Sequence, residues 1–165
     1  MNFQFYLEKL SNSDIFKKFK KENKGAYLCS GFFSIDIQGK DNQQHLDFYS
    51  SSKNKMVSFQ LEKSLEPVPL ENYDKRVPEK LKDNLDFDFD EIEKMILNKM
   101  KEENVNKQIQ KLLFSLQNMK GKNFLIGTIF ISGMGILKVT ISLDENTIVN
   151  FEKKSILDMF KIIKK

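Results

Sequence analysis

The chain has 165 residues and a formal net charge of +4, and 40% of its residues are hydrophobic, with fifteen phenylalanines. A chain of this length and apolar content can bury a core of its own, which excludes an intrinsically disordered protein. Cys29 is the only cysteine, which excludes an intramolecular disulfide, and Arg76 is the only arginine, which disfavours base-specific nucleic-acid recognition because lysine lacks the planar guanidinium fork.

The expected compartment follows from the first residues and from the cysteine content. The opening MNFQFYLEKLSNSD has no basic region, no unbroken apolar region and no small-residue cleavage site of the kind that marks a signal peptide. No apolar run approaches the roughly 18 to 20 residues that a membrane-spanning helix needs. We therefore expect a soluble, cytoplasmic protein without a transmembrane segment.

The first 62 residues predict a helical segment followed by three strands. Apolar residues at helical spacing, and Ser13 as an N-cap before a second apolar stripe, predict a short helix or a broken pair of helices. Alternation of apolar and polar residues then predicts strands over residues 26–38, 45–49 and 56–62, separated by polar turns. Both faces of the first strand are partly apolar, which is typical of a well-covered strand.

Residues 63–84 contain all three prolines of the chain among many charges, which predicts an extended linker. Helical stripes follow from Ile92 to Met100 and from Val105 to Leu116, and Asn104 is the expected N-cap of the second stripe. The remaining sequence predicts three more strands and a basic amphipathic helix, over residues 124–132, 136–143, 148–152 and 154–165.

The order of these elements predicts an α+β fold made of two halves, each a helical segment plus a three-stranded antiparallel sheet, with a C-terminal helix. The expected units are a first half over 1–62, a proline-containing linker over 63–84, and a second half over 85–165. The halves are interpreted as an internal repeat, with two unrelated α+β halves as the alternative. Two such small sheets are expected to pack against each other around an approximate twofold axis, because neither can bury its second face alone.

Residues 112–160, which run from LLFSLQNMKGK to SILDMF, resemble the PepSY-like helix-plus-three-strand unit. With AYLCSGFF, HLDFY and SLQN in that order, the whole chain also resembles a family of small archaeal proteins. The PepSY-like resemblance implies a binding or inhibitory module rather than an enzyme, since such domains occur in protease propeptides and cell-envelope proteins. The turn Asp144-Glu145-Asn146-Thr147 departs from that family, which usually has a glycine there.

An acidic run, LDFDFDE, looks like the opening of a calcium-binding loop because Asp86, Asp88 and Asp90 alternate. Such a loop needs glycine at its sixth position and glutamate at its twelfth, and the chain has Glu91 and Leu97 there. We interpret the carboxylates as residues that precede and cap a helix, whose N-terminal amides favour them.

Three other motifs have a structural interpretation as well. GMG at 133–135 is followed by neither a helix nor a Lys-Ser/Thr pair, so it predicts a hairpin turn rather than a phosphate loop. Cys29 and His45 could form a nucleophile and base, but no third orienting group is apparent, and we expect a packed thiol and a strand-edge imidazole. No ligand spacing indicates a metal site or another cofactor, so we expect neither, and no enzymatic activity.

Two lysine-rich helices are the strongest functional signal in the sequence. Their apolar stripes are expected to cap the sheets, and their lysines either face water or contact an anionic partner. The candidate contacts are Lys17, Lys18, Lys20, Lys21, Lys161, Lys164 and Lys165.

The favoured function is a non-enzymatic binding or interaction module whose partner is a protein or peptide, and which is able to form a homodimer. The alternative is an accessory protein of RNA or the ribosome that grips phosphates through lysine-rich helix faces without reading bases. A hydrolase or transferase would need converging polar groups that the sequence does not show.

Overall fold

A computed structural model describes residues 1–71 and 76–157 of the chain. Within these residues it contains three α-helices and eight β-strands. The helices are α1 (Phe3–Ser11), α2 (Asp14–Glu22) and α3 (Phe89–Glu102). The strands are β1 (Tyr27–Asp36), β2 (Gln43–Ser50), β3 (Lys55–Gln60), β4 (Pro67–Leu70), β5 (Ile109–Met119), β6 (Lys122–Ile131), β7 (Gly135–Ser142) and β8 (Thr147–Ser155).

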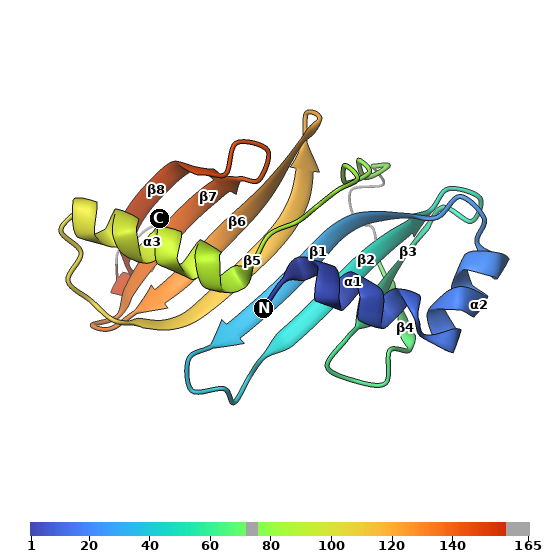
Figure 1. Ribbon diagram of the computed structural model, residues 1–165, viewed down its shortest axis with the longest axis horizontal. Coiled ribbons are helices and arrows are strands. Elements are labelled where there is room, and N and C mark those ends of the chain that lie inside the picture. Colours follow the sequence, from blue (N-terminus) through green and yellow to red (C-terminus); the bar gives the residue numbers. More distant parts are fainter. Residues whose placement is uncertain (72–75, 158–165) are drawn as a thin grey trace.

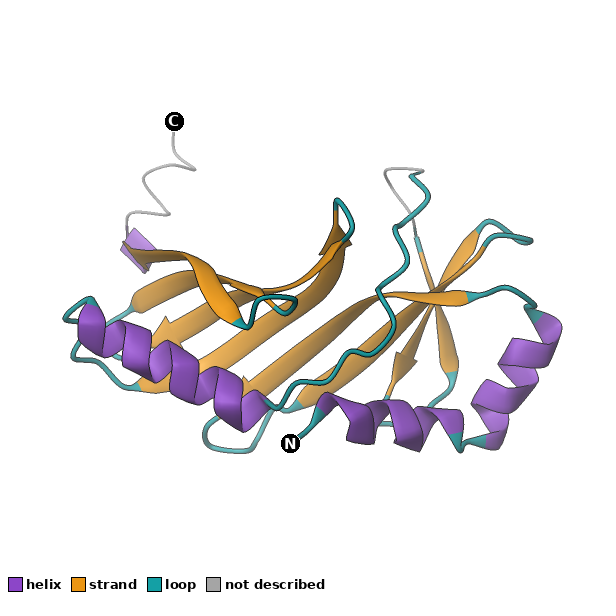
Figure 2. Cartoon of the chain, turned by 45° about the horizontal axis from the view of Figure 1, so that its top comes forward, coloured by secondary structure: helices purple, strands orange, loops and turns teal. Residues whose placement is uncertain are grey.

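All eight strands belong to one antiparallel sheet with the order β4-β3-β2-β1-β5-β6-β7-β8. Three strands, β2 to β4, lie on one side of the central β1–β5 pair, and β6 to β8 lie on the other side (Figure 1). In that pair Phe33 lies opposite Phe114. The three helices lie on one face of the sheet (Figure 2). The molecule therefore has two layers, and the second face of the sheet carries no described helix.

The prediction of two halves with three strands each is wrong. Residues that were expected to continue a helix form β5, which pairs with β1 on one side and β6 on the other. The apolar residues of this stretch fit helical spacing and strand alternation equally well, and its buried residues Leu112, Phe114 and Leu116 follow the strand period. Asn104 has a φ of +57° and lies just beyond the end of α3, so it does not begin a helix.

The predicted linker and the C-terminal region both contain strand residues that the sequence did not predict. Residues 67–70 form β4, an edge strand paired with β3, where proline is tolerated because an outer strand edge needs no N–H donor. At the other end of the chain β8 extends to Ser155. Residues 154 and 155 of the predicted C-terminal helix therefore belong to β8, and residues 156 and 157 are helical. The rest of the predicted helix, with Lys161, Lys164 and Lys165, lies outside the described residues.

Several local predictions are confirmed. The N-terminal segment is a broken pair of helices, and the Ser13 hydroxyl accepts a hydrogen bond from the Phe16 amide at 3.2 Å as the N-cap of α2. Asp88 caps α3 by accepting from the Asp90 amide at 2.7 Å. The glycine-rich motif is a turn between β6 and β7, with Gly133 at a φ of +77°.

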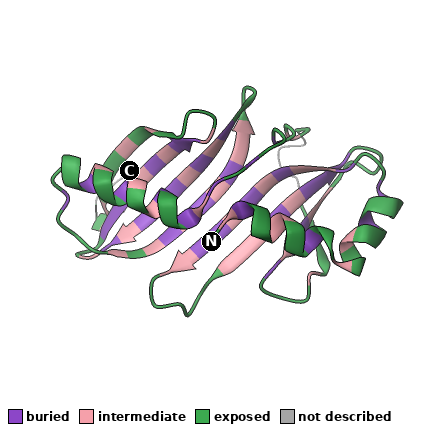
Figure 3. Ribbon diagram, in the orientation of Figure 1, coloured by how far each residue is buried: buried purple, intermediate pink, exposed green. Residues whose placement is uncertain are grey.

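The buried apolar residues between the helices and the sheet form one cluster that spans both sides of the β1–β5 pair, and buried positions alternate along the strands (Figure 3). Phe89 of α3 contacts Phe33 of β1 and Phe114 of β5, with ring centroids 4.8 and 6.0 Å apart. Phe3 of α1 stacks on Phe87 at 4.8 Å. Residues from the two ends of the sheet therefore share one core.

Residues 78–87, here called the strap, cross the helix side of the sheet and run to the start of α3 (Figure 2). Leu81, Leu85 and Phe87 of the strap are buried in the core. The Leu81 amide donates to the Leu28 carbonyl at 3.0 Å, and the Lys82 amide donates to the Asn123 side chain at 3.2 Å. The strap is thus an ordered part of the helix layer.

Candidate interaction face

The face of the sheet opposite the helices is here called the open face. Phe33 and Phe114 point toward the helix layer. Strand side chains alternate, so Phe32 and Leu113 point the other way. The pairing registers extend this face across β6, placing Ile126 beside Ser115 and Phe130 beside Lys111. The open face therefore carries an apolar centre of half-buried residues, and these are Phe32, Leu113, Phe124, Ile126 and Phe130.

Polar side chains lie among these apolar residues. Ser115 lies between Phe32 and Ile126, and Thr128 lies opposite Leu113. Several of these polar groups are paired: Ser30 donates to the Asp47 carboxylate at 2.7 Å, and Lys138 donates to the Thr128 hydroxyl at 3.1 Å. The open face thus combines half-buried apolar side chains with polar side chains that bond to one another, a combination that suits contact with another surface.

His45 lies beside the apolar centre, and its side chain contacts the carboxylate of Glu62. Its Nε2 is 3.0 Å from Glu62 Oε1, and its ring lies 5.7 Å from the Phe32 ring. Burial of Glu62 opposes its charged form, but hydrogen bonds from the Gln44 amide and the His45 ring outweigh burial and lower the pKa of the carboxyl. The His45 imidazole is therefore bonded to an ionised carboxylate just beyond the end of β3.

Cys29 is a packed thiol, as predicted. Its Sγ donates to the Asp47 carbonyl at 3.3 Å. Burial, with the Asp47 carboxylate as a smaller cause, raises the pKa of Cys29 to about 12. The register places His45 opposite Phe32 and not opposite Cys29. A thiol with this pKa carries almost no thiolate at neutral pH, so the two residues do not make a nucleophile and base.

The three aspartates of the acidic run have separate structural partners. Asp86 accepts from the Asn2 side chain at 2.9 Å, and Asp90 is 3.1 Å from the N-terminal ammonium. The hydrogen bond from the Asp90 amide lowers the pKa of Asp88. Among residues 1–71 and 76–157, no group of three or more His, Cys, Asp or Glu could hold a metal ion.

The four predicted lysines of α2 are all exposed. Lys18 lies 3.9 Å from Glu22, and Lys20 donates to the Ala26 carbonyl at 2.7 Å. Lys17 and Lys21 complete the group. No helix of the described part of the chain is long and apolar enough to cross a membrane.

The sequence contained a signal for the open face that was interpreted differently. Apolar residues on both faces of the first strand indicated a strand covered on both sides. In the structure one set, with Phe33, meets the helices, and the other set, with Phe32, lies on the open face. Leu113 was missed because its stretch was expected to be helical, which would have placed it on a helix stripe with Leu116.

Comparison with known proteins supports the fold alone. No family model matches the chain, and no curated protein matches it in sequence. A crystal structure of a "putative lipoprotein" from Clostridium difficile 630 superposes with a TM-score of 0.56 at 14% identity, covering 86% of this chain and 91% of that one. The PepSY-like and archaeal resemblance stays a prediction, and the helix that it required at residue 112 is the strand β5.

Proposed function

We propose that this chain is a non-enzymatic binding module that holds a protein or peptide partner against the open face of its sheet. The observation that carries the proposal is the apolar centre, where Phe32, Leu113 and Phe130 from three neighbouring strands lie on a face without a described covering element. Large apolar side chains that gather on one uncovered face are typical of interaction sites.

The open face has the residue types of protein interfaces. Aromatic residues are enriched at such interfaces, which also contain polar groups. Here Phe32 and Phe124 are aromatic members of the centre, and the polar pairs Gln117–Ser115 and Lys138–Thr128 lie among and beside the apolar residues. Strand side chains are held rigidly by pairing on both sides, so a partner would meet a preorganised surface.

Site-specific photocrosslinking in extracts of the native cell tests this proposal. A photoreactive phenylalanine analogue at Leu113 is expected to capture a discrete protein partner, and the same probe at Leu97 is expected not to. Leu97 is a matched control because it is 38% exposed on α3, on the helix side of the molecule. Identical products from both positions, or no product from Leu113, would contradict a site on the open face.

A second candidate function rests on the exposed lysines of α2. Lys17, Lys18, Lys20 and Lys21 on one nine-residue helix could contact RNA phosphates without reading bases. Replacing all four by alanine is then expected to reduce RNA binding and to flatten its dependence on salt. The Leu113 probe would be unaffected, so the two candidate functions are separable.

A further inference from the structure

A cleft of about 610 Å³ lies on the helix side of the sheet, away from the open face. Gln4 and Leu7 of α1 form one wall, and residues 80–85 of the strap form the opposite wall. Leu28 of β1 and Phe48 of β2 lie between these walls. The cleft therefore has the volume typical of small-molecule sites in proteins, about 300 to 1,000 Å³.

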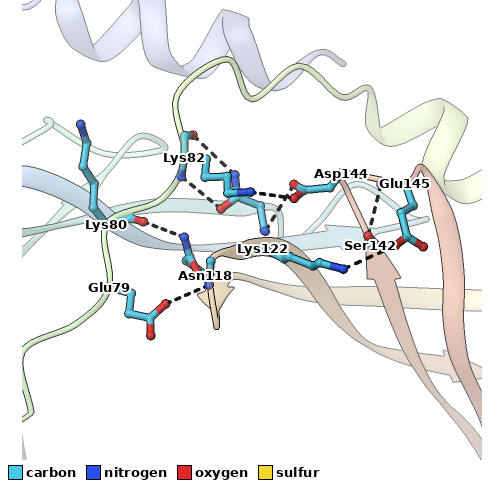
Figure 4. Close-up of polar contacts among 10 residues, drawn as sticks. Glu79, Lys80, Lys82, Asn118, Lys122, Ser142, Asp144 and Glu145 are labelled. Atoms are coloured by element: carbon cyan, nitrogen blue, oxygen red, sulfur yellow. Dashed lines mark hydrogen bonds and ion pairs between the residues drawn. The ribbon is translucent and has the colours of Figure 1, made fainter.

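The strap wall is held in place by hydrogen bonds to the strand beneath it. The Leu81 amide donates to the Leu28 carbonyl at 3.0 Å, and the Tyr27 hydroxyl donates to the Pro78 carbonyl at 2.6 Å. Figure 4 shows further polar contacts on the other side of the strap, including the Asn118 side chain with the Lys80 carbonyl at 2.8 Å. The cleft is thus formed without a ligand and needs little rearrangement to accept one.

The charges at the cleft are mainly positive. Its lining includes Lys20, Lys80 and Lys82, and one carboxylate, Asp83. Lys80 lies 3.5 Å from Asp83, and Lys82 bonds to Asp144 at 3.1 Å. Both of these lysines therefore have an acidic partner.

Lys20 differs from the other two lysines in the partner that its ammonium contacts. Its Nζ donates to the Ala26 carbonyl at 2.7 Å, which orients the ammonium but leaves its charge uncompensated by that contact. An ammonium has three donors, so others remain for an anion. Lys20 is therefore the lysine of the cleft that would bind a ligand carboxylate most strongly.

Part of the remaining lining is apolar. Leu7 of α1 and Leu28 of β1 are half-buried there, while Phe48, Leu81 and Leu85 lie beneath them in the core. An alkyl chain over Leu7 and Leu28 would gain affinity from each methylene that it removes from water. The apolar lining and the oriented ammonium favour a ligand with an apolar body and one anionic end.

We propose that this cleft binds a small organic carboxylate with an unbranched apolar tail, of the size of a medium-chain fatty acid. The carboxylate lies at Lys20, and the tail lies along Leu7 and Leu28 between α1 and the strap. This site is independent of the partner site on the open face, because it is on the other side of the sheet.

Isothermal titration calorimetry of the full chain with decanoate tests the proposal. We expect saturable binding with one site per chain, and no measurable binding of acetate, which lacks the tail. Decanol, which lacks the charge, is expected to bind at least about tenfold more weakly than decanoate. Absence of saturable decanoate binding, or equal binding of decanol and decanoate, would overturn the proposal.

Two variants locate the site. Lys20→Met is expected to weaken decanoate binding about tenfold, and Lys94→Met, an exposed lysine on α3, is expected to leave it unchanged. Gln4→Trp places a large side chain in the wall of the cleft from an exposed position and is expected to abolish binding. If neither Lys20→Met nor Gln4→Trp alters the affinity of a folded variant, the ligand binds elsewhere and the proposed site is wrong.

Discussion

Cys29 and His45 lie on neighbouring strands, yet each is engaged by a different structural partner. The thiol bonds to a backbone carbonyl, and the imidazole bonds to Glu62. The carboxyl of Glu62 also accepts from the Gln44 amide at 3.0 Å, which ties the end of β3 to the start of β2. At the scale of single residues, Cys29 and His45 are thus both engaged in structural contacts.

The lowered pKa of Glu62 predicts a pH-dependent contribution to stability. A carboxyl whose pKa is lower in the folded state stabilises the fold at pH values above its ordinary pKa of 4.5. This stabilisation is lost as the pH falls through the folded-state pKa. Glu62→Gln should lower the free energy of unfolding by about 1 kcal/mol at pH 7, a modest figure because the pair is partly exposed to solvent. Urea unfolding at a series of pH values from 7 downward measures this difference, which should shrink as the pH falls through the folded-state pKa of Glu62.

Glu66→Gln is the matched control for this measurement. Glu66 lies in the same connection between β3 and β4 and is exposed. Its replacement is expected to change the unfolding free energy little at any of these pH values. A Glu62→Gln effect that stayed constant across the whole series would mean that packing, and not the ionised carboxyl, accounts for the loss.

The side chain of Ser13 separates α1 from α2. The Ser13 hydroxyl accepts from the Phe16 amide and donates to the Leu10 carbonyl at 2.7 Å, so it ends one helix and begins the next. This break allows Phe16 and Phe19 to reach Phe59 of β3, with ring centroids 5.4 and 5.1 Å apart. The cap thereby positions the apolar stripe of α2 on the sheet.

Removal of this cap should destabilise the protein by a predictable amount. Ser13→Ala leaves an amide of the first turn of α2 without its side-chain acceptor, and we expect a loss of about 1 kcal/mol in the free energy of unfolding. Ser13→Thr keeps the hydroxyl and should retain most of the stability. Thermal unfolding followed by circular dichroism compares the two variants, and equal losses in both would argue against the capping role.

The strap and the β1–β5 pair make the molecule one unit. Asn123 of β6 is 2% exposed, and its side chain accepts from the Lys82 amide at 3.2 Å and donates to the Lys82 carbonyl at 3.5 Å. Asp144 adds an ion pair with the Lys82 side chain (Figure 4), and that ammonium lowers the pKa of Asp144. The strap is therefore attached to β6 through the buried side-chain amide of Asn123.

Asn123→Ala should loosen the strap. We expect a loss of about 2 kcal/mol in the free energy of unfolding, because both backbone groups of Lys82 lose their side-chain partner in a buried place. Hydrogen exchange over residues 78–87 should become faster, most clearly at the Leu81 amide. Asp144→Asn, which removes only an exposed ion pair, is expected to leave this exchange nearly unchanged, and a similar acceleration in both variants would contradict the role given to Asn123.

The sequence by itself determined the elements whose signals are local. The cap at Ser13, the start of α3 at Asp88, the turn at Gly133 and six of the strands depend on neighbouring residues and on the alternation of side chains within one segment. The packed state of Cys29 was predictable for the same reason, since an apolar strand interior without a neighbouring base indicates burial.

Only the tertiary structure decided whether the stretch that contains Leu113 is a helix or a strand. Its apolar spacing satisfies both periods, and pairing with β1 and β6 on its two sides provides the hydrogen bonds that favour a strand. That choice joins all the strands into one sheet, creates the open face around Phe32, and leaves the strap to fill the helix layer. These features depend on contacts between residues far apart in the chain, and such contacts have no signature within any single segment.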